Sequence, residues 1–276
     1  MTAVTWPGEV VARDHALAEQ VWGALGTVQD PELDEPITDL KFVTTVEIDR
    51  GEQGAEVSIR LRLPTYFCAP NFAYLMVADA YDAVAALSEV SRTSVWLDDH
   101  FASDEINNGV AARAGFTGSF PTEARLSEAK GEVLGELEEL RQTFQRKAYL
   151  ASLDRLTKRL SADGVEFDAY TSLRIGDLPA GLETDSLMRR RNDVGLPLTE
   201  MSLVMVEHDG EPMGAERLPK RLRFAKSVRV SIEGNGIFCR GLLETRYGDD
   251  ESPGTQSGIG AFDGADLGMP TLRRES

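Results

Sequence analysis

The sequence predicts an α+β protein, and three observations support this class. Residues 14–28 repeat apolar side chains at helical spacing, residues 42–63 alternate in two runs as strands do, and residues 70–87 return to helical spacing. A third alternating run covers residues 93–97. The order helix, strand, strand, helix, strand describes a small domain with one sheet.

The first predicted helix has a clear start and stop. Asp14 can cap its first turn with a carboxylate oxygen, and Pro31 lacks the N–H that a continuing helix needs. Between them, four apolar residues form one stripe: Leu17, Val21, Leu25 and Val28. This stripe predicts a helix with one buried face.

The next two runs predict a β-hairpin around a turn at residues 51–54. Hairpin strands are antiparallel, whereas a helical connection makes the third strand parallel to the second. The sheet is therefore mixed. The start of the first strand then lies at the same edge of the sheet as the ends of the second and third strands.

Chemically reactive side chains fall at that edge. Asp30, Glu32 and Asp39 precede the first strand, Cys68 follows the second, and His100 follows the third. Cys68 lies in a turn that opens a helix, where backbone N–H groups and the helix dipole favour a thiolate. We expect these side chains to share one rim of the sheet, with Cys68, His100 and Asp39 as candidate metal ligands.

Each of these residues also has a structural interpretation. Free cysteines are often buried and inert, which applies to Cys68. Asp30, Pro31 and Glu32 can serve only to stop the helix and form a turn. His100 can be an ordinary surface residue, because Ser103 reads as the start of a new helix.

Composition narrows the class of partner. The net charge of −17 argues against nucleic acid, which requires a dense basic surface, so partners are expected to be proteins. The chain has only two cysteines, Cys68 and Cys239, and these form no metal-binding spacing or disulfide framework, as is typical of the reducing cytoplasm. We find no export signal and no apolar run that would anchor the chain in a membrane.

The rest of the chain predicts architecture rather than chemistry. We divide it into residues 1–102, 103–163, 164–247 and 248–276. The second part is a loop-rich rim followed by a long helical segment, Thr122 to Ala162, which would extend about 60 Å. The third part is predicted to be β-rich, with strands at residues 201–207, 227–232 and 237–244, and the last part to be a flexible tail.

Two features of the predicted β-rich part bear on function. Cys239 falls in a strand after an Asn235-Gly236 turn signal, so it is expected to be a core residue. The segment Arg217–Lys226 is strongly basic within an acidic chain. Such runs are usually solvated faces, but this one can also dock on an acidic surface of the chain or of a partner.

The acidic motif Asp30-Pro31-Glu32, the predicted hairpin at residues 42–63 and the Thr65-x-x-Cys68 turn together resemble a known family. It is the metal-sulfur, or iron-sulfur, cluster assembly family of the PaaD and SufT type, and the resemblance covers about residues 15–100. Position by position, it implies cofactor-binding roles for Asp30, Glu32 and Cys68. Two departures stand out: Ala69 separates Cys68 from Pro70, and Leu40-Lys41-Phe42 replaces the more usual Leu-Gly.

The resemblance implies a cytoplasmic, non-enzymatic maturation factor. The expected client is a multicomponent di-iron monooxygenase, served through protein contacts and transient iron or iron–sulfur handling at Cys68. An alternative is a stoichiometric structural subunit of the monooxygenase with a vestigial site. A minor alternative is a cysteine hydrolase with Cys68 as nucleophile and His100 as base. A homodimer is left open.

Overall fold

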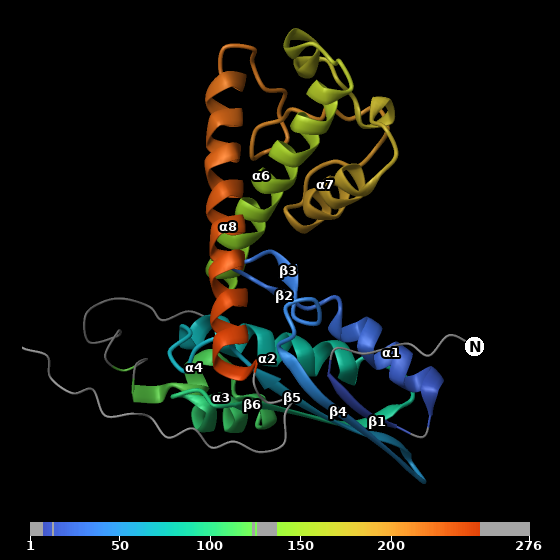
Figure 1. Cartoon of the computed structure of the whole chain (residues 1–276). Helices are drawn as coiled ribbons and strands as arrows, with labels where there is room; N and C mark the ends of the chain where they lie inside the picture. The colour runs from blue at the N-terminus through green and yellow to red at the C-terminus, as the bar shows by residue number, and fades with distance from the viewer. Residues whose placement is uncertain (1–7, 13, 123–124, 126–136, 249–276) are drawn as a thin grey trace, which may run out of the picture.

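The computed structural model describes residues 8–12, 14–122, 125 and 137–248 of the 276-residue chain. Figure 1 shows an N-terminal domain, residues 8–122, with a helical extension, residues 137–248, standing on it. Each region has its own hydrophobic core. One core joins residues between Leu17 and Phe120, and the other joins residues between Tyr149 and Ala225.

The N-terminal domain is built on a mixed sheet, as predicted. Its strands are β1 (Glu9–Ala12), β4 (Val43–Gly51), β5 (Gly54–Arg62) and β6 (Val90–Asp98), in the spatial order β1-β4-β5-β6. The β4 and β5 strands are antiparallel, and β5 and β6 are parallel, which confirms the predicted hairpin and crossover. Strand β1, which pairs parallel with β4, was not expected from the sequence.

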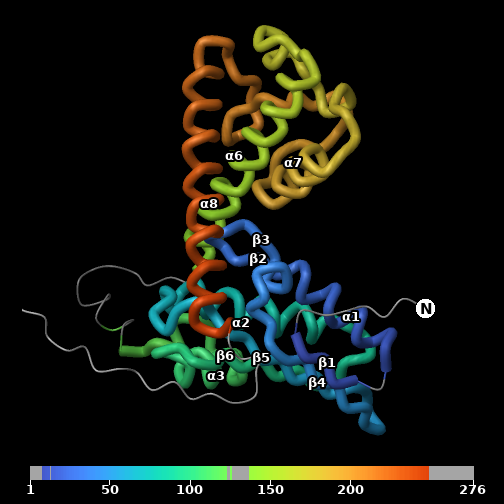
Figure 2. The backbone as a smooth tube through the Cα atoms, in the orientation of Figure 1, coloured from blue at the N-terminus to red at the C-terminus, as the bar shows by residue number. Residues whose placement is uncertain are grey.

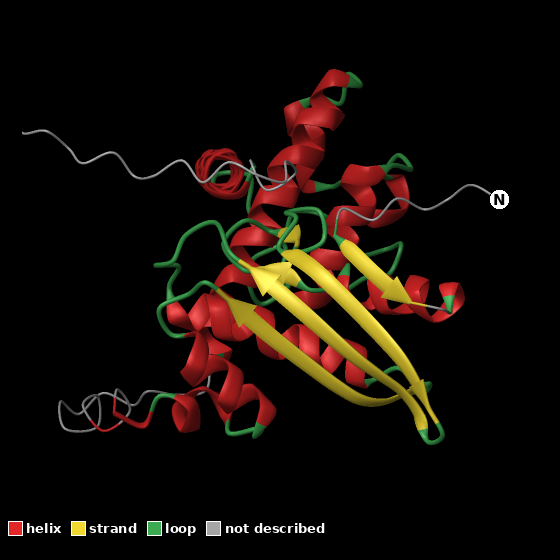
Figure 3. Ribbon diagram, turned by 60° about the horizontal axis from the view of Figure 1, so that its bottom comes forward, coloured by secondary structure: helices red, strands yellow, loops and turns green. Residues whose placement is uncertain are grey.

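Helices pack on one face of this sheet (Figure 3). They are α1 (His15–Leu25) and α2 (Pro70–Ala85), and they are joined at the sheet's end by α3 (Ser103–Ala111) and α4 (Gly115–Ser119). Asp14 caps α1 as predicted, because its Oδ1 accepts the N–H groups of Ala16 and Leu17, both at 3.1 Å. The α1 helix ends at Leu25, before Pro31.

The acidic motif forms a small hairpin that the sequence did not predict. Strands β2 (Gln29–Asp30) and β3 (Glu35–Pro36) pair antiparallel and hold the residues between them in a tight loop. Leu33 and Ile37, at 2% and 0% exposure, anchor this hairpin to the N-terminal core. We call residues 30–35 the acidic loop.

The extension consists of helices. It contains α6 (Glu138–Ala162), the 3-10 turns η1 (Phe167–Thr171) and η2 (Ile175–Asp177), α7 (Leu182–Asp193) and α8 (Leu218–Tyr247). The tube in Figure 2 shows α6 leading away from the N-terminal domain and α8 returning beside it to the sheet. The C-terminal half of α8 therefore lies on the N-terminal domain.

The α+β class is confirmed, but the strands predicted within the extension are wrong. Residues 227–232 and 237–244 both lie inside α8, and residues 201–207 form only isolated bridges, Arg174 with Leu203 and Val206 with Pro212. A turn follows at His208-Asp209-Gly210, with Gly210 at φ +87°. Gly234 and Gly236 sit in the helix rather than in a hairpin turn.

The long predicted helix is shorter in the described residues. Helix α6 has 25 residues, which gives a length of about 38 Å at 1.5 Å per residue. Residues 126–136 of the predicted segment, and residues 249–276 of the predicted flexible tail, lie outside the described residues. Among the helices that are described, none combines the length and apolar character needed to cross a membrane.

Candidate functional site

Cys68 lies where the sequence predicted, in the turn between β5 and α2. Its backbone N–H donates to Thr65 O at 3.5 Å, and its Sγ lies 3.3 Å from Thr65 Oγ1. Pro70 begins α2 just after it, so the half-buried thiol is close to the start of a 16-residue helix. No side chain caps that helix, and its first N–H groups face the same turn.

His100 holds this turn to the end of β6. Its Nε2–H donates to the carbonyl oxygen of Cys68 at 2.7 Å, while its Nδ1 accepts the N–H of Ala102 at 3.2 Å. Burial lowers the pKa of His100, and the hydrogen bond to Cys68 only partly opposes this. Both ring nitrogens of the neutral imidazole are therefore engaged with backbone groups.

This geometry bears on two roles predicted for His100. The histidine and Cys68 do lie at the same end of the sheet, but the ring contacts the carbonyl of Cys68 rather than its thiol. In this arrangement His100 is not placed to act as the base of a cysteine hydrolase, and it has no free nitrogen for a metal ion. Its ring instead links the turn at Cys68, after β5, to the segment that follows β6.

Asp30 is the most deeply buried carboxyl of the acidic motif, with 8% of its surface exposed. Its Oδ1 accepts the N–H groups of Glu32 and Leu33, both at 2.8 Å, which folds the acidic loop around it. Burial raises the pKa of Asp30 to about 6, even though these hydrogen bonds favour the carboxylate. The nearby charges of Glu32 and Glu35 add to the rise.

The other predicted carboxylates have different surroundings. Glu32 is half-buried and accepts a hydrogen bond from Asn235 of α8 at 3.2 Å. Asp39 is exposed in the turn before β4, where Thr38 Oγ1 donates to it at 3.4 Å. The metal role of Asp39 stays a prediction.

Cys239 is not the strand residue that the sequence predicted. It lies in α8, half-buried against the N-terminal core. Burial raises the pKa of Cys239 to about 11, and the charges of Asp30, Cys68 and Glu32 raise it further, with Arg240 in opposition. This cysteine therefore packs against the same N-terminal core as Cys68. No sequence signal indicated this, because the two residues are far apart in the chain.

Helix α8 is fixed to this edge by polar contacts of residues that follow Cys239. Arg240 Nη1 forms an ion pair with Glu35 at 2.7 Å, and Arg246 Nη2 forms one with Asp99 at 2.6 Å. The hydroxyl of Tyr247 also donates to Asp99 at 2.6 Å. This edge of the sheet is thus partly covered by the extension.

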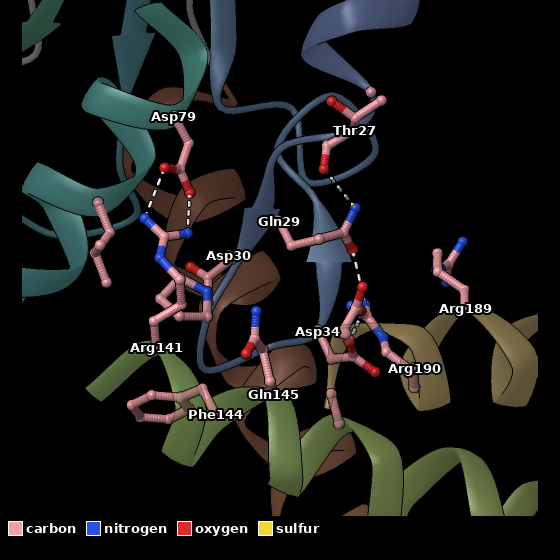
Figure 4. Close-up of a pocket in the computed structure, with 15 residues that line it drawn as sticks. Thr27, Gln29, Asp30, Asp34, Asp79, Arg141, Phe144, Gln145, Arg189 and Arg190 are labelled. Carbon is pink, nitrogen blue, oxygen red and sulfur yellow. Dashed lines mark hydrogen bonds and ion pairs between the residues drawn. The ribbon is translucent and has the colours of Figure 1, made fainter. Parts of the chain in front are cut away.

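A second set of contacts joins α6 and α7 to the domain around a cavity of about 340 Å³ (Figure 4). Arg141 binds both carboxylate oxygens of Asp79, at 2.7 and 2.8 Å. Arg190 pairs with the buried Asp34, which has a positive φ of 57° in the acidic loop. Because the charges on its walls largely neutralise one another, we interpret this cavity as a polar seam between the two regions.

An aromatic cluster contains the two residues that directly precede Cys68 in the chain. Tyr66 and Phe67 pack edge to face with ring centroids 5.0 Å apart, and Phe101 lies 6.3 Å from each. Phe67 is 78% exposed. Exposed aromatic side chains next to a reactive residue are typical of a protein-binding surface.

The described residues contain no group of three or more His, Cys, Asp and Glu side chains that could hold a metal ion by themselves. A metal ion at this edge would therefore need ligands from elsewhere, such as a partner protein or a small thiol.

The comparison with protein families agrees with this geometry. Residues 18–96 match the family model described as iron-sulfur cluster assembly protein. The predicted resemblance is confirmed for this segment, which includes Asp30, Glu32, Asp39 and Cys68 but neither His100 nor the extension. No curated protein and no solved structure matched the chain.

Proposed function

We propose that this protein assists the maturation of a metalloenzyme by handling iron or an iron–sulfur cluster at Cys68. The observation that carries the proposal is the family match over residues 18–96, which coincides with the region that presents Cys68 at a helix start beside the acidic loop. Iron or the cluster is cargo in this function, and Cys68 is its thiolate ligand.

A single thiolate suits cargo that must be passed on. Clusters held for electron transfer use four protein ligands, whereas a site with fewer leaves positions for the ligands of the receiving protein. The link through His100 fixes the backbone of Cys68, so the thiol keeps its position without the imidazole occupying the metal.

The exposed aromatic cluster of Tyr66, Phe67 and Phe101 supports a protein client. Such side chains supply much of the binding energy in protein interfaces, and here they lie beside the proposed cargo site. The client we propose is a multicomponent di-iron monooxygenase, in the cytoplasm, as the family resemblance implied.

Cluster transfer tests the proposed handling of an iron–sulfur cluster at Cys68. The full chain is reconstituted with Fe³⁺ and sulfide without oxygen, and transfer to an apo plant-type ferredoxin is followed by visible circular dichroism. We expect transfer from the wild type and none from Cys68→Ser, while Cys239→Ser separates the effect of the second thiol. Equal transfer by wild type and Cys68→Ser would remove the proposed role of Cys68.

Co-expression tests the client. A di-iron monooxygenase from the same genome is produced with wild-type protein, with Phe67→Ser, or with Phe224→Ser, a matched exposed aromatic on α8. We expect Phe67→Ser alone to lower the iron content and specific activity of the oxygenase. Unchanged iron content without the protein would contradict the proposal.

The same experiment addresses the structural-subunit alternative, which the covering of the site by α8 favours. A maturation factor is absent from the active oxygenase after gel filtration. A structural subunit remains with it at fixed stoichiometry, and its Cys68→Ser variant supports full activity.

A further inference from the structure

The described residues contain two free thiols, and they come from the two ends of the fold. Cys68 ends the connection from β5 to α2, and Cys239 lies in the last helix. Both are half-buried and both pack against the same N-terminal core. Cys239 lies outside the family match, so its position beside this core is a feature of the extension.

The face of α8 that carries Cys239 is fixed by its neighbours. Asn235, Cys239, Leu243 and Arg246 follow one another at intervals of four, four and three, so they share one face of the helix. Asn235 donates to Glu32, Leu243 packs against the N-terminal core, and Arg246 pairs with Asp99. The thiol of Cys239 must therefore point toward the N-terminal domain.

The same contacts place Cys68 next to this face. Asp99, which anchors Arg246, directly precedes His100, and His100 binds the carbonyl of Cys68 at 2.7 Å. Glu32, which accepts the hydrogen bond from Asn235, belongs to the acidic loop.

We propose that Cys68 and Cys239 together bind one thiophilic metal ion, with the remaining coordination positions left to water or a small thiol. This inference deepens the proposed function and rests on it. Thiolates are the protein ligands that soft and borderline metal ions such as Zn²⁺, Co²⁺ and Fe²⁺ accept readily. Binding releases the thiol protons and leaves a two-thiolate complex.

An open two-thiolate site agrees with the surroundings. Because the described residues supply no group of three or more ligands for a metal ion, the ion would remain accessible to incoming ligands. It would also bridge the domain and the extension, since each contributes one thiolate.

Cobalt provides a direct test on the full, reduced chain. Co²⁺ is titrated without oxygen, and the near-ultraviolet thiolate-to-cobalt charge-transfer band is recorded, because its intensity grows with the number of thiolates bound. We expect one Co²⁺ per chain, and in Cys68→Ser and Cys239→Ser about half of the band. Affinity should fall at least about 10-fold, since even the loss of a supporting partner costs 10–100-fold.

The variant Cys239→Ser/Ile237→Cys is a matched control. It keeps two cysteines but moves one thiol to a position that is 70% exposed on α8. The band should stay at the half intensity of Cys239→Ser. A full band in this control, or a wild-type spectrum in Cys239→Ser, would overturn the inference.

A metal-free measurement guards against misfolded variants. Dibromobimane becomes fluorescent when it bridges two nearby thiols, so the wild type should fluoresce and both single serine variants should not. An absence of bridging in the wild type contradicts the shared site. Cluster transfer that depends on Cys68 but occurs without a two-thiolate cobalt band would remove this inference and leave the proposed function standing.

Discussion

The N-terminal domain and the extension differ in how they are held together and in how well the sequence pattern predicts their secondary structure. In the domain, alternation and helical spacing predicted α1, β4, β5, α2 and β6 correctly. Strand β5 shows the reason, because it buries every second residue along its length. In the extension, β-branched residues and glycines suggested strands, yet residues 218–247 form one helix. The sequence pattern predicts secondary structure correctly where an element buries one face against a single core. The prediction fails for α8, which contacts two different regions.

Helix α8 shows the reason. Its N-terminal half packs in the core of the extension through residues such as Leu218 and Ala225, whereas its C-terminal half meets the N-terminal core through Cys239 and Leu243. Gly236 would cost about 1 kcal/mol in an isolated helix. Here it allows close approach, since a Cβ would lie 3.3 Å from Glu35 Oε1.

The two regions meet mainly through charge. Five arginines of the extension pair with carboxylates of the domain: Arg141 with Asp79, Arg155 and Arg190 with Asp34, Arg240 with Glu35, and Arg246 with Asp99. Part of the domain's acidic surface is thereby neutralised within the chain. The basic stretch predicted to dock on acidic surface does so locally, because Arg217 and Arg221 pair with Glu207.

The largest expected effect is from Arg191, which has 0% exposure in the core of the extension. Its guanidinium donates to the carbonyls of Pro197 and Val204 at 2.8 to 3.1 Å. Arg191→Met leaves these buried oxygens without donors, so we expect a loss of roughly 2–5 kcal/mol. Hydrogen exchange should accelerate in α7 but not in β4–β6.

The exposed neighbour Arg189 provides the control, because Arg189→Met removes a similar charge at the surface. It should change stability by less than about 0.5 kcal/mol. Equal acceleration of exchange in both regions after Arg191→Met would show that they unfold as one unit.

A smaller effect is expected for Asp30 and depends on pH. Its pKa is about 6 in the fold against 3.8 in the unfolded chain, so the folded state binds more protons between these values. The contribution of Asp30 to stability is therefore greatest below about pH 4, falls as the pH rises through 6, and is constant above that. Asp30→Asn keeps the acceptor for Glu32 and Leu33 but has no charge to bury.

We expect Asp30→Asn to be more stable than the wild type by roughly 1–3 kcal/mol at pH 7 and nearly equal to it at pH 4. Urea denaturation across this range measures the difference. Asp39→Asn is the control, since the exposed Asp39 should show no such pH dependence. Parallel pH profiles of Asp30→Asn and wild type would contradict the buried-carboxyl interpretation.

The smallest effect on stability is expected for an exposed ion pair between α8 and the N-terminal domain. Arg240 and Glu35 are 45% and 37% exposed, so Arg240→Gln should cost less than about 1 kcal/mol, and less again at high salt. Thermal unfolding should barely change, while amides in the last turns of α8 exchange faster. A cost above about 2 kcal/mol would mean that the contact between α8 and the N-terminal domain depends on this ion pair far more than its exposure indicates.

The sequence by itself determined strands β4, β5 and β6 of the N-terminal sheet, the position of Cys68 at a helix start and the meeting of Cys68 with His100 at one sheet end. These follow from alternation, from turn residues and from the handedness of a strand–helix–strand connection, which are local properties or general rules. The tertiary structure alone decided that α8 is a helix, that it contacts the acidic loop, and that Cys239 packs against the N-terminal core. Those outcomes depend on ion pairs and close packing between residues some 200 positions apart, such as Asn235 with Glu32 at a separation of 203, and no local pattern carries that information.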